Sequence, residues 1–235
     1  MKVMLPEWKK LPTDWIRSKQ ENSNVLRSMY WSNNGASNIS ALMLYIVLSQ
    51  NANSSPDKKF NEVGCCFITY DTFSDITGLS RSLISKGLNT LIEFDLITKN
   101  HLGKQSHYKI KNYEKSKWGK VPYAGLYDNA GKEINAFSSF SLRKKIELNA
   151  LKLYLLYIAF RDSNTNYASI SYTKISEYTG LTRNEISHAN SFLVALHLIE
   201  IRVGESIKEL NKPMNIYRIN HINPYHHSGS RPNLR

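Results

Sequence analysis

The chain has 235 residues, with 31 Lys and Arg against 19 Asp and Glu, and this net charge of +12 favours a polyanionic partner such as nucleic acid, although charge alone fits a merely soluble basic protein equally well. Its two cysteines, Cys65 and Cys66, are adjacent, which disfavours a disulfide and supplies too few ligands for structural zinc, so a reducing cytoplasm is expected. The longest apolar run, Ala41 to Leu48, is too short to cross a bilayer, and we expect neither a membrane span nor a signal peptide.

The elements predicted along the chain fall into two similar halves. Residues 1–36 are expected to form an N-terminal arm, and Ala41 to Leu48 is dense enough in apolar residues for a buried helix. Leu148 to Phe160 has the same character and opens the second half. Asn51 to Phe67 is rich in Asn, Ser, Pro and Lys and therefore predicts a loop.

A repeat of 33 residues supports this division. Ile68 to Asn100 aligns without a gap on Ile170 to Arg202, at a constant offset of 102, with twelve identical positions. Each copy predicts a short helix, a tight turn containing Thr-Gly-Leu, a second helix and an apolar exit. This is the pattern of a helix-turn-helix.

The second helix of each copy is predicted to be capped and amphipathic. Ser80 is placed to cap the first, and Thr182 with Glu185 has the spacing of a capping box. Gly87 and Ala189, small residues at the same position, indicate close approach to a neighbouring helix. The residues expected to be buried are Ile84, Leu88, Leu91 and Ile92 in the first copy and Ile186, Leu193 and Val194 in the second, where Asn190 replaces Leu88.

The opposite faces of these helices carry the residue types that read the major groove of DNA. Arg donates two hydrogen bonds to guanine, Asn pairs with adenine, and Ser and Lys reach bases or phosphates. The alternative is an ordinary solvated helix face. The predicted DNA-binding residues are Arg81, Ser82, Ser85, Lys86 and Asn89 in the first copy and Arg183, Asn184, Ser187, His188 and Ser191 in the second.

A β-hairpin is predicted after each repeat. Lys99 to Ile110 contains the first around a Gly-containing turn, and Glu200 to Val203 with Asn215 to Ile219 forms the second. The first is strongly basic, and we expect its lysines to hold a phosphate backbone, the alternative being lysines that block strand pairing at an edge. These are Lys99, Lys104, Lys109 and Lys111, continued by Lys115, Lys117 and Lys120; Glu205 and Glu209 are expected to offset Arg202 and Lys208 in the second hairpin.

Two segments lie outside the repeats. Residues 113–140 include Trp118, Tyr123, Tyr127 and Phe137 among their aromatic side chains, so we expect an ordered linker in which 121–126 and 132–137 form a small hairpin packed on the second half. Residues 221–235 are expected to be a flexible basic tail.

Helix, strand, helix-turn-helix and hairpin is the order of a winged helix, and each half resembles a winged helix-turn-helix domain. The layout is similar to that of plasmid replication initiators and two-domain repressors. The resemblance implies a mainly α fold with small β-hairpins (α+β) and two tandem winged-helix domains, at 37–112 and 141–220.

The function that this resemblance implies is sequence-specific binding of double-stranded DNA by a transcriptional regulator acting through operator occupancy. Alternatives are a plasmid or phage replication initiator at repeated origin sites and, in another class, a protein-interaction or dimerisation module. Homodimer formation through the apolar first helices stays open. No enzymatic activity, metal, cofactor or small-molecule ligand is expected, because phosphate-loop and metal-ligand patterns are lacking in the sequence.

Overall fold

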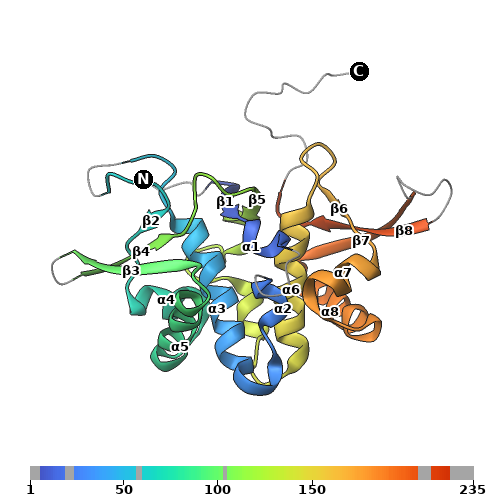
Figure 1. Ribbon diagram of the computed structural model, residues 1–235, viewed down its shortest axis with the longest axis horizontal. Coiled ribbons are helices and arrows are strands. Elements are labelled where there is room, and N and C mark those ends of the chain that lie inside the picture. Colours follow the sequence, from blue (N-terminus) through green and yellow to red (C-terminus); the bar gives the residue numbers. More distant parts are fainter. Residues whose placement is uncertain (1–5, 19–23, 57–59, 103–104, 206–212, 223–235) are drawn as a thin grey trace.

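The computed structural model describes residues 6–18, 24–56, 60–102, 105–205 and 213–222, and these form a mixed α/β structure with small antiparallel sheets (Figure 1). None of the described helices is both long enough and apolar enough to span a membrane. The helices and strands are, in chain order, β1 (Trp8–Pro12), α1 (Asp14–Arg17), α2 (Val25–Ser28), α3 (Trp31–Asn51), β2 (Cys65–Cys66), α4 (Tyr70–Thr77), α5 (Arg81–Glu93), β3 (Ile97–Leu102), β4 (Gln105–Ile110), β5 (Trp118–Pro122), the 3-10 helices η1 (Ala124–Leu126) and η2 (Asn135–Ser139), α6 (Lys145–Phe160), β6 (Tyr167–Ser169), α7 (Tyr172–Thr179), α8 (Arg183–Ala195), β7 (Ile199–Glu205) and β8 (Pro213–Ile219).

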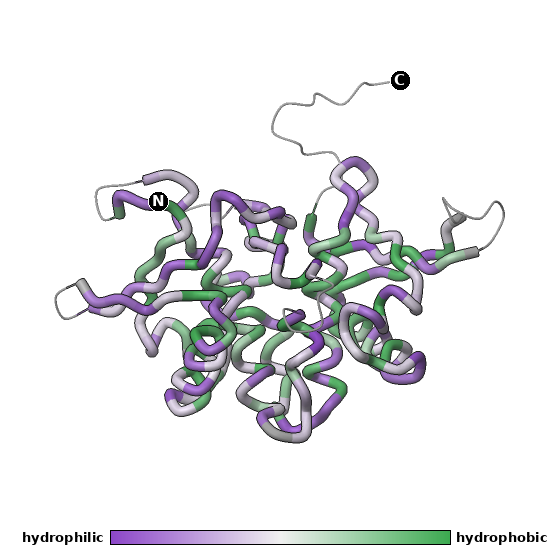
Figure 2. Tube along the Cα trace, in the orientation of Figure 1, coloured by the Kyte–Doolittle hydropathy of each residue, from purple (hydrophilic) through white to green (hydrophobic). Residues whose placement is uncertain are grey.

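Two buried helices, α3 and α6, pack against each other at the centre of the molecule (Figure 1). Residues 41–48 of α3 and 148–159 of α6 are buried on every side. This burial explains why apolar residues occur around the whole circumference of both segments. Figure 2 shows hydrophobic segments concentrated in the interior and polar ones toward the outer loops. The two halves of the chain therefore share one continuous hydrophobic core.

The two repeats have the same architecture. Each three-stranded sheet has the same antiparallel order, β2-β4-β3 in the first half and β6-β8-β7 in the second. The turns match atom by atom: the hydroxyls of Thr77 and Thr179 donate to the carbonyl four residues earlier, at 2.6 Å in both copies. Gly78 and Gly180 end α4 and α7 in the left-handed region, at φ 70° and 72°, where glycine is favoured.

Gly87 sets the distance between α5 and α3. A Cβ atom at this position would lie 2.9 Å from the backbone nitrogen of Ala41 and 2.8 Å from Cδ1 of Leu44. The second copy has Ala189 here, fully buried. The expected close approach to a neighbouring helix is therefore observed in the first copy, and α3 is that neighbour.

The N-terminal residues are part of the core. Strand β1 pairs with β5 in a separate two-stranded ribbon, and Leu11, Ile16, Leu26 and Met29 are buried. The guanidinium of Arg17 donates to the carbonyl of Ala159 at the end of α6. The first central helix begins at Trp31, earlier than the predicted start of the first domain at 37.

The segment at 113–140 differs from its predicted form. A single isolated bridge, Tyr127 to Ile134, replaces the expected hairpin. Residues 121–122 of its first predicted strand belong to β5, 124–126 form η1, and 135–137 of the second predicted strand lie in η2. The backbone nitrogen of Ile134 donates to the carbonyl of Ile76 in the first half, at 3.0 Å. The Phe140 ring lies edge-on to Phe192 of α8, with centroids 5.4 Å apart, so the segment also packs on the second half, as predicted. The two chain segments on either side of the turn at 128–131 pair at one position only. Burial of the aromatic side chains Tyr127 and Phe137 determines their conformation instead.

We predict that Gly87→Val lowers the free energy of unfolding by about 1–3 kcal/mol, because the added methyl groups force α5 away from α3. Urea denaturation measures this change. Asn89→Ala, on the exposed side of the same helix, is the matched control and should change stability by less than about 0.5 kcal/mol. Equal effects of both substitutions would contradict the close contact.

Candidate nucleic-acid interface

Helix α5 lies at the flank of the first half (Figure 1), and its outer face is polar. The hydroxyl of Ser80 accepts from the backbone nitrogen of Leu83 at 3.4 Å, as expected for the cap. Ile84, Leu88 and Leu91 are buried beneath it. Of the predicted contact residues, Arg81, Ser82, Lys86 and Asn89 are exposed and Ser85 is half-buried.

Helix α8 occupies the equivalent position in the second half. The predicted capping box is present: Thr182 accepts from the Glu185 nitrogen, and the Glu185 carboxylate accepts from the Thr182 nitrogen at 2.8 Å. Ile186 and Leu193 are buried on its inner side. The predicted contact residues Arg183, Asn184, Ser187, His188 and Ser191 are all exposed.

The predicted burial is wrong for two residues. Ile92 is 39% exposed and Val194, at the matching position, is 41% exposed. The buried stripe runs at positions 84, 87, 88 and 91 and at 186, 189, 190 and 193, because the small residues at 87 and 189 bring that side of each helix closest to the core. The residue one turn after 88 or 190 then lies at the edge of the contact.

The two equivalent arginines are held differently. A side-chain nitrogen of Arg81 lies 2.5 Å from a carboxylate oxygen of Asp71, and both side chains are mostly exposed. Arg183 instead lies over the ring of Tyr172, at 5.3 Å from its centroid. Both guanidiniums point outward, but the first must exchange a carboxylate for any new acceptor. The sequence prediction missed both partners. Tyr70 occupies the position of Tyr172 in the first copy, but it lies under Lys99 and not under Arg81.

The lysines of the first hairpin do not form the predicted continuous strip. Lys99 lies opposite Tyr108 in the register and Lys109 opposite Thr98, so alternation places the two lysines on opposite faces of the sheet. Lys99 lies 5.6 Å from the ring centroid of Tyr70. The predicted contact Lys104 lies outside the described residues.

Other lysines of the predicted strip have partners within the protein. Lys109 forms an ion pair with Glu62, which raises the pKa of that lysine, and Lys111 lies 2.9 Å from Asp95. Lys120 is 3% exposed, with its ammonium 4.5 Å from the Trp8 ring centroid, and burial lowers its pKa. Lys115 and Lys117 remain exposed. Strand pairing and burial, which act over long sequence separations, divide a group that is contiguous in sequence.

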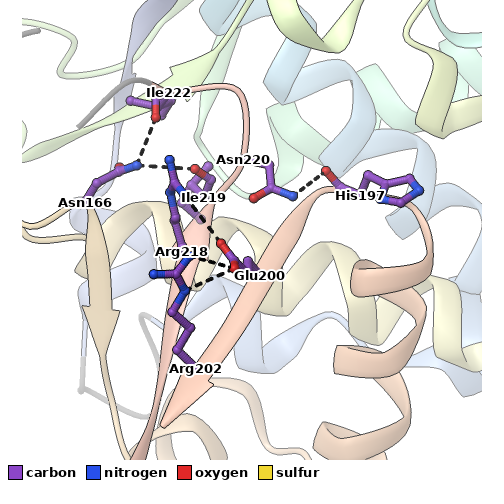
Figure 3. Close-up of polar contacts among 8 residues, drawn as sticks. All are labelled: Asn166, His197, Glu200, Arg202, Arg218, Ile219, Asn220 and Ile222. Atoms are coloured by element: carbon purple, nitrogen blue, oxygen red, sulfur yellow. Dashed lines mark hydrogen bonds and ion pairs between the residues drawn. The ribbon is translucent and has the colours of Figure 1, made fainter. Parts of the chain in front are cut away.

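One carboxylate partly offsets two arginines on the second hairpin (Figure 3). Glu200 lies 2.8 Å from Arg202 and 3.5 Å from Arg218, and the hydrogen bond from Arg202 is the main reason that its pKa is lowered. The predicted partner Glu205 has no described side chain, and Lys208 and Glu209 lie outside the described residues. The offset to Arg202 therefore comes from Glu200, its neighbour on the same face of β7.

The end of β8 is anchored by two asparagines (Figure 3). The side-chain nitrogen of Asn166 donates to the carbonyl of Ile222 at 3.0 Å, and Asn220 donates to the carbonyl of His197 at 2.9 Å. Ile222 is 3% exposed. The predicted tail is therefore wrong at its first two residues, which belong to the fold, and residues 223–235 lie outside the described part of the chain.

Asn190 connects α8 to the central helix α6. Its side-chain oxygen accepts a hydrogen bond from the Tyr157 hydroxyl at 2.8 Å, and both residues are buried. Tyr157 in turn stacks on Tyr217 of β8, with ring centroids 4.0 Å apart. The polar residue that the sequence marked as an exception therefore contacts another element.

The outer faces of α5 and α8 offer guanidinium, ammonium, amide and hydroxyl groups, which can donate to and accept from base edges and phosphates. Within the described residues, no group of three or more His, Cys, Asp or Glu side chains is placed to hold a metal ion. Comparison with protein-family models and with curated proteins finds no match to the chain. Function is therefore inferred from the two helix faces themselves.

We predict that Tyr157→Phe lowers the free energy of unfolding by about 1–3 kcal/mol, because it leaves the buried Asn190 oxygen without its donor. The double variant Tyr157→Phe with Asn190→Leu should recover most of this loss, since both polar groups are then removed. Chemical denaturation of both single variants and of the double variant measures the coupling. Additive losses would show that the hydrogen bond does not fix α8.

Proposed function

We propose that the protein is a sequence-specific double-stranded DNA-binding protein built from two tandem winged-helix units. The supporting observation is the repeated order of elements, α3-β2-α4-α5-β3-β4 and α6-β6-α7-α8-β7-β8, in which a capped helix with an exposed polar face precedes a hairpin. In such units the second helix of the pair enters the major groove and the hairpin lies along the backbone. The net charge of +12 suits a phosphate-rich partner.

Under this proposal α5 and α8 read the bases. Arg81 and Arg183 stand at the first position of each helix, where they donate two hydrogen bonds to guanine. Asn89 and Asn184 suit adenine, and the serines and His188 contact bases or phosphates. Arg81 exchanges Asp71 for the base, whereas Arg183 leaves only an aromatic ring.

The mechanism is occupancy without covalent chemistry. Because both units are built on the α3–α6 core, the distance between the two reading helices is fixed by packing, and the two contacted sites need a fixed spacing. Covering an operator in this way blocks polymerase, which makes a transcriptional regulator the first choice. A replication initiator would bind repeated sites beside an AT-rich segment that melts, and footprinting with a single-strand-specific probe separates the two roles.

The protein-interaction alternative loses its most evident surface. Leu42 to Leu48 and Leu151 to Phe160, the apolar segments that would join two chains, are buried inside this one, apart from the half-buried Phe160. These two helices pack against each other within one chain, so they join its two similar units. The observations therefore favour DNA reading over dimerisation through these helices.

We predict that Arg81→Ala combined with Lys86→Ala lowers the affinity for the selected duplex at least tenfold, because each removes a base or phosphate contact worth about 1–3 kcal/mol. Both side chains are exposed, so the melting temperature should stay the same. Fluorescence anisotropy with a duplex selected from a random pool measures the affinity.

The matched control, Lys9→Ala with Lys132→Ala, removes two positive charges outside α5 and should weaken binding far less. Arg183→Ala with Asn184→Ala tests whether α8 also reads bases. Full specific binding by the α5 variant would mean that this helix is not a reader.

Salt dependence distinguishes the lysines of the first hairpin. Lys99→Gln should reduce the log–log salt slope of DNA binding by about 0.9, as expected for one lost phosphate contact. Lys109→Gln should change the slope less, because a phosphate would first have to displace Glu62 from that ammonium. Binding constants measured between low and moderate salt decide the matter, and an equal change in both variants would restore the continuous strip.

A further inference from the structure

A cavity of about 190 Å³ lies beside the start of α8. Its walls come from Arg27 and residues 29–32, from α6, and from the turn between α7 and α8 together with Glu185 of α8. Arg27 and Lys145 are exposed side chains of its lining, whereas Lys152 and Thr179 are buried. The space is many times the roughly 15 Å³ that a single water needs, so it has room for a small molecule.

Lys152 is a charged group with no opposite charge bound to it. It is 3% exposed, and its ammonium donates to the carbonyl oxygens of Thr179 at 2.7 Å and Met29 at 3.2 Å. Among the described residues it forms no salt bridge. An ammonium has three donors, so one remains for a further acceptor.

Burial is the main reason that the pKa of Lys152 is lowered to about 7. The Glu185 carboxylate acts to raise this pKa, and Lys145 and Arg27 act to lower it further. In the folded protein Lys152 therefore loses its proton well below pH 10.5, the usual pKa of a lysine, and between about pH 7 and pH 10.5 the unfolded chain binds more protons. The free energy of unfolding therefore rises with pH in that window. This gain is lost as the pH falls toward 7 and the buried lysine becomes charged.

The cavity as a whole carries excess positive charge. Three cations, Arg27, Lys145 and Lys152, face one carboxylate, Glu185. That carboxylate is already engaged: it lies 2.6 Å from Lys145 and also accepts from the Thr182 nitrogen and hydroxyl. An incoming anion would therefore meet cations that the protein leaves under-compensated.

We propose that this cavity binds a small free oxyanion, a molecule bearing a carboxylate or phosphate group, with Lys152 and Arg27 as its cationic ligands. The anion supplies the acceptor that the third donor of Lys152 lacks, in a site of low dielectric where such a charge-assisted hydrogen bond is strong. It also holds Lys152 protonated on the carbonyl of Thr179, the residue directly before the Gly180 turn that leads into α8.

An effect of this anion on DNA affinity rests on the proposed function, but the binding itself does not. The test therefore uses the protein without DNA. Thermal unfolding is followed at constant ionic strength while acetate or inorganic phosphate replaces chloride. We expect the melting temperature to rise saturably with at least one anion, because ligand that binds only the folded state stabilises it. The anion that acts identifies the carboxylate or the phosphate class.

The side chain of Lys152 gives a second, local readout. Titration of the lysine side chains by NMR should show the pKa of Lys152 rising by about one unit or more when the active anion is bound. The effect of acetate on melting should also be larger at pH 6.5 than at pH 9, where Lys152 is neutral. An unchanged Lys152 titration at saturating concentrations of both anions would overturn the proposal.

Variants separate binding from a purely structural role of the lysine. Arg27→Gln, at an exposed position, should weaken the apparent anion affinity about tenfold, and Lys152→Met should abolish the rise in melting temperature that the anion causes. Lys174→Gln removes an exposed lysine outside the cavity and should leave this rise intact. If Arg27→Gln and Lys174→Gln respond to both anions like the unaltered protein, the cavity is not the site. Loss of DNA binding in the α5 variants leaves all of these outcomes unchanged.

Discussion

The contact between α3 and α6 is the interaction on which the rest of the molecule depends. Residues 41–48 of α3 and 148–159 of α6 are buried on every side, and each large apolar side chain removed from water contributes about 1.5–3 kcal/mol. Helix α5 packs on the first through Gly87, and α8 is joined to the second by the Tyr157–Asn190 hydrogen bond. The orientation of both polar helix faces therefore follows from how these two helices are packed.

Local signals in the sequence predicted most of the helices and hairpins. Helix ends depend on nearby residues, such as the caps Ser80 and Thr182 and the left-handed Gly78. The repeat in the sequence therefore predicts these ends to within a residue or two. Side-chain surroundings depend on distant strands and helices. The ion pair of Lys109 with Glu62 spans 47 positions, and the burial of Lys120 depends on pairing with β1, which no periodicity reports. Lys152 was missed for the same reason, since a single lysine in an apolar helix carries no pattern.

The two copies have kept their backbone and changed their polar chemistry. Where the first copy has Leu88 in the core, the second has Asn190 and needs a tyrosine hydroxyl to satisfy it. Where the first holds its leading arginine with a carboxylate, the second uses an aromatic ring. Cavity, buried lysine and capping carboxylate meet beside α8. The proposed anion site therefore belongs to the second unit, beside α8.

Joining both units in one chain has a further consequence. A symmetric assembly of identical subunits presents the same side chains twice, which restricts it to palindromic or directly repeated half-sites. Here Lys86 corresponds to His188 and Ser82 to Asn184, so the paired surfaces are chemically distinct. If both contact one duplex, the preferred sequence has a left and a right end that cannot be exchanged. The protein then binds in a single direction, giving polarity to whatever assembles beside it.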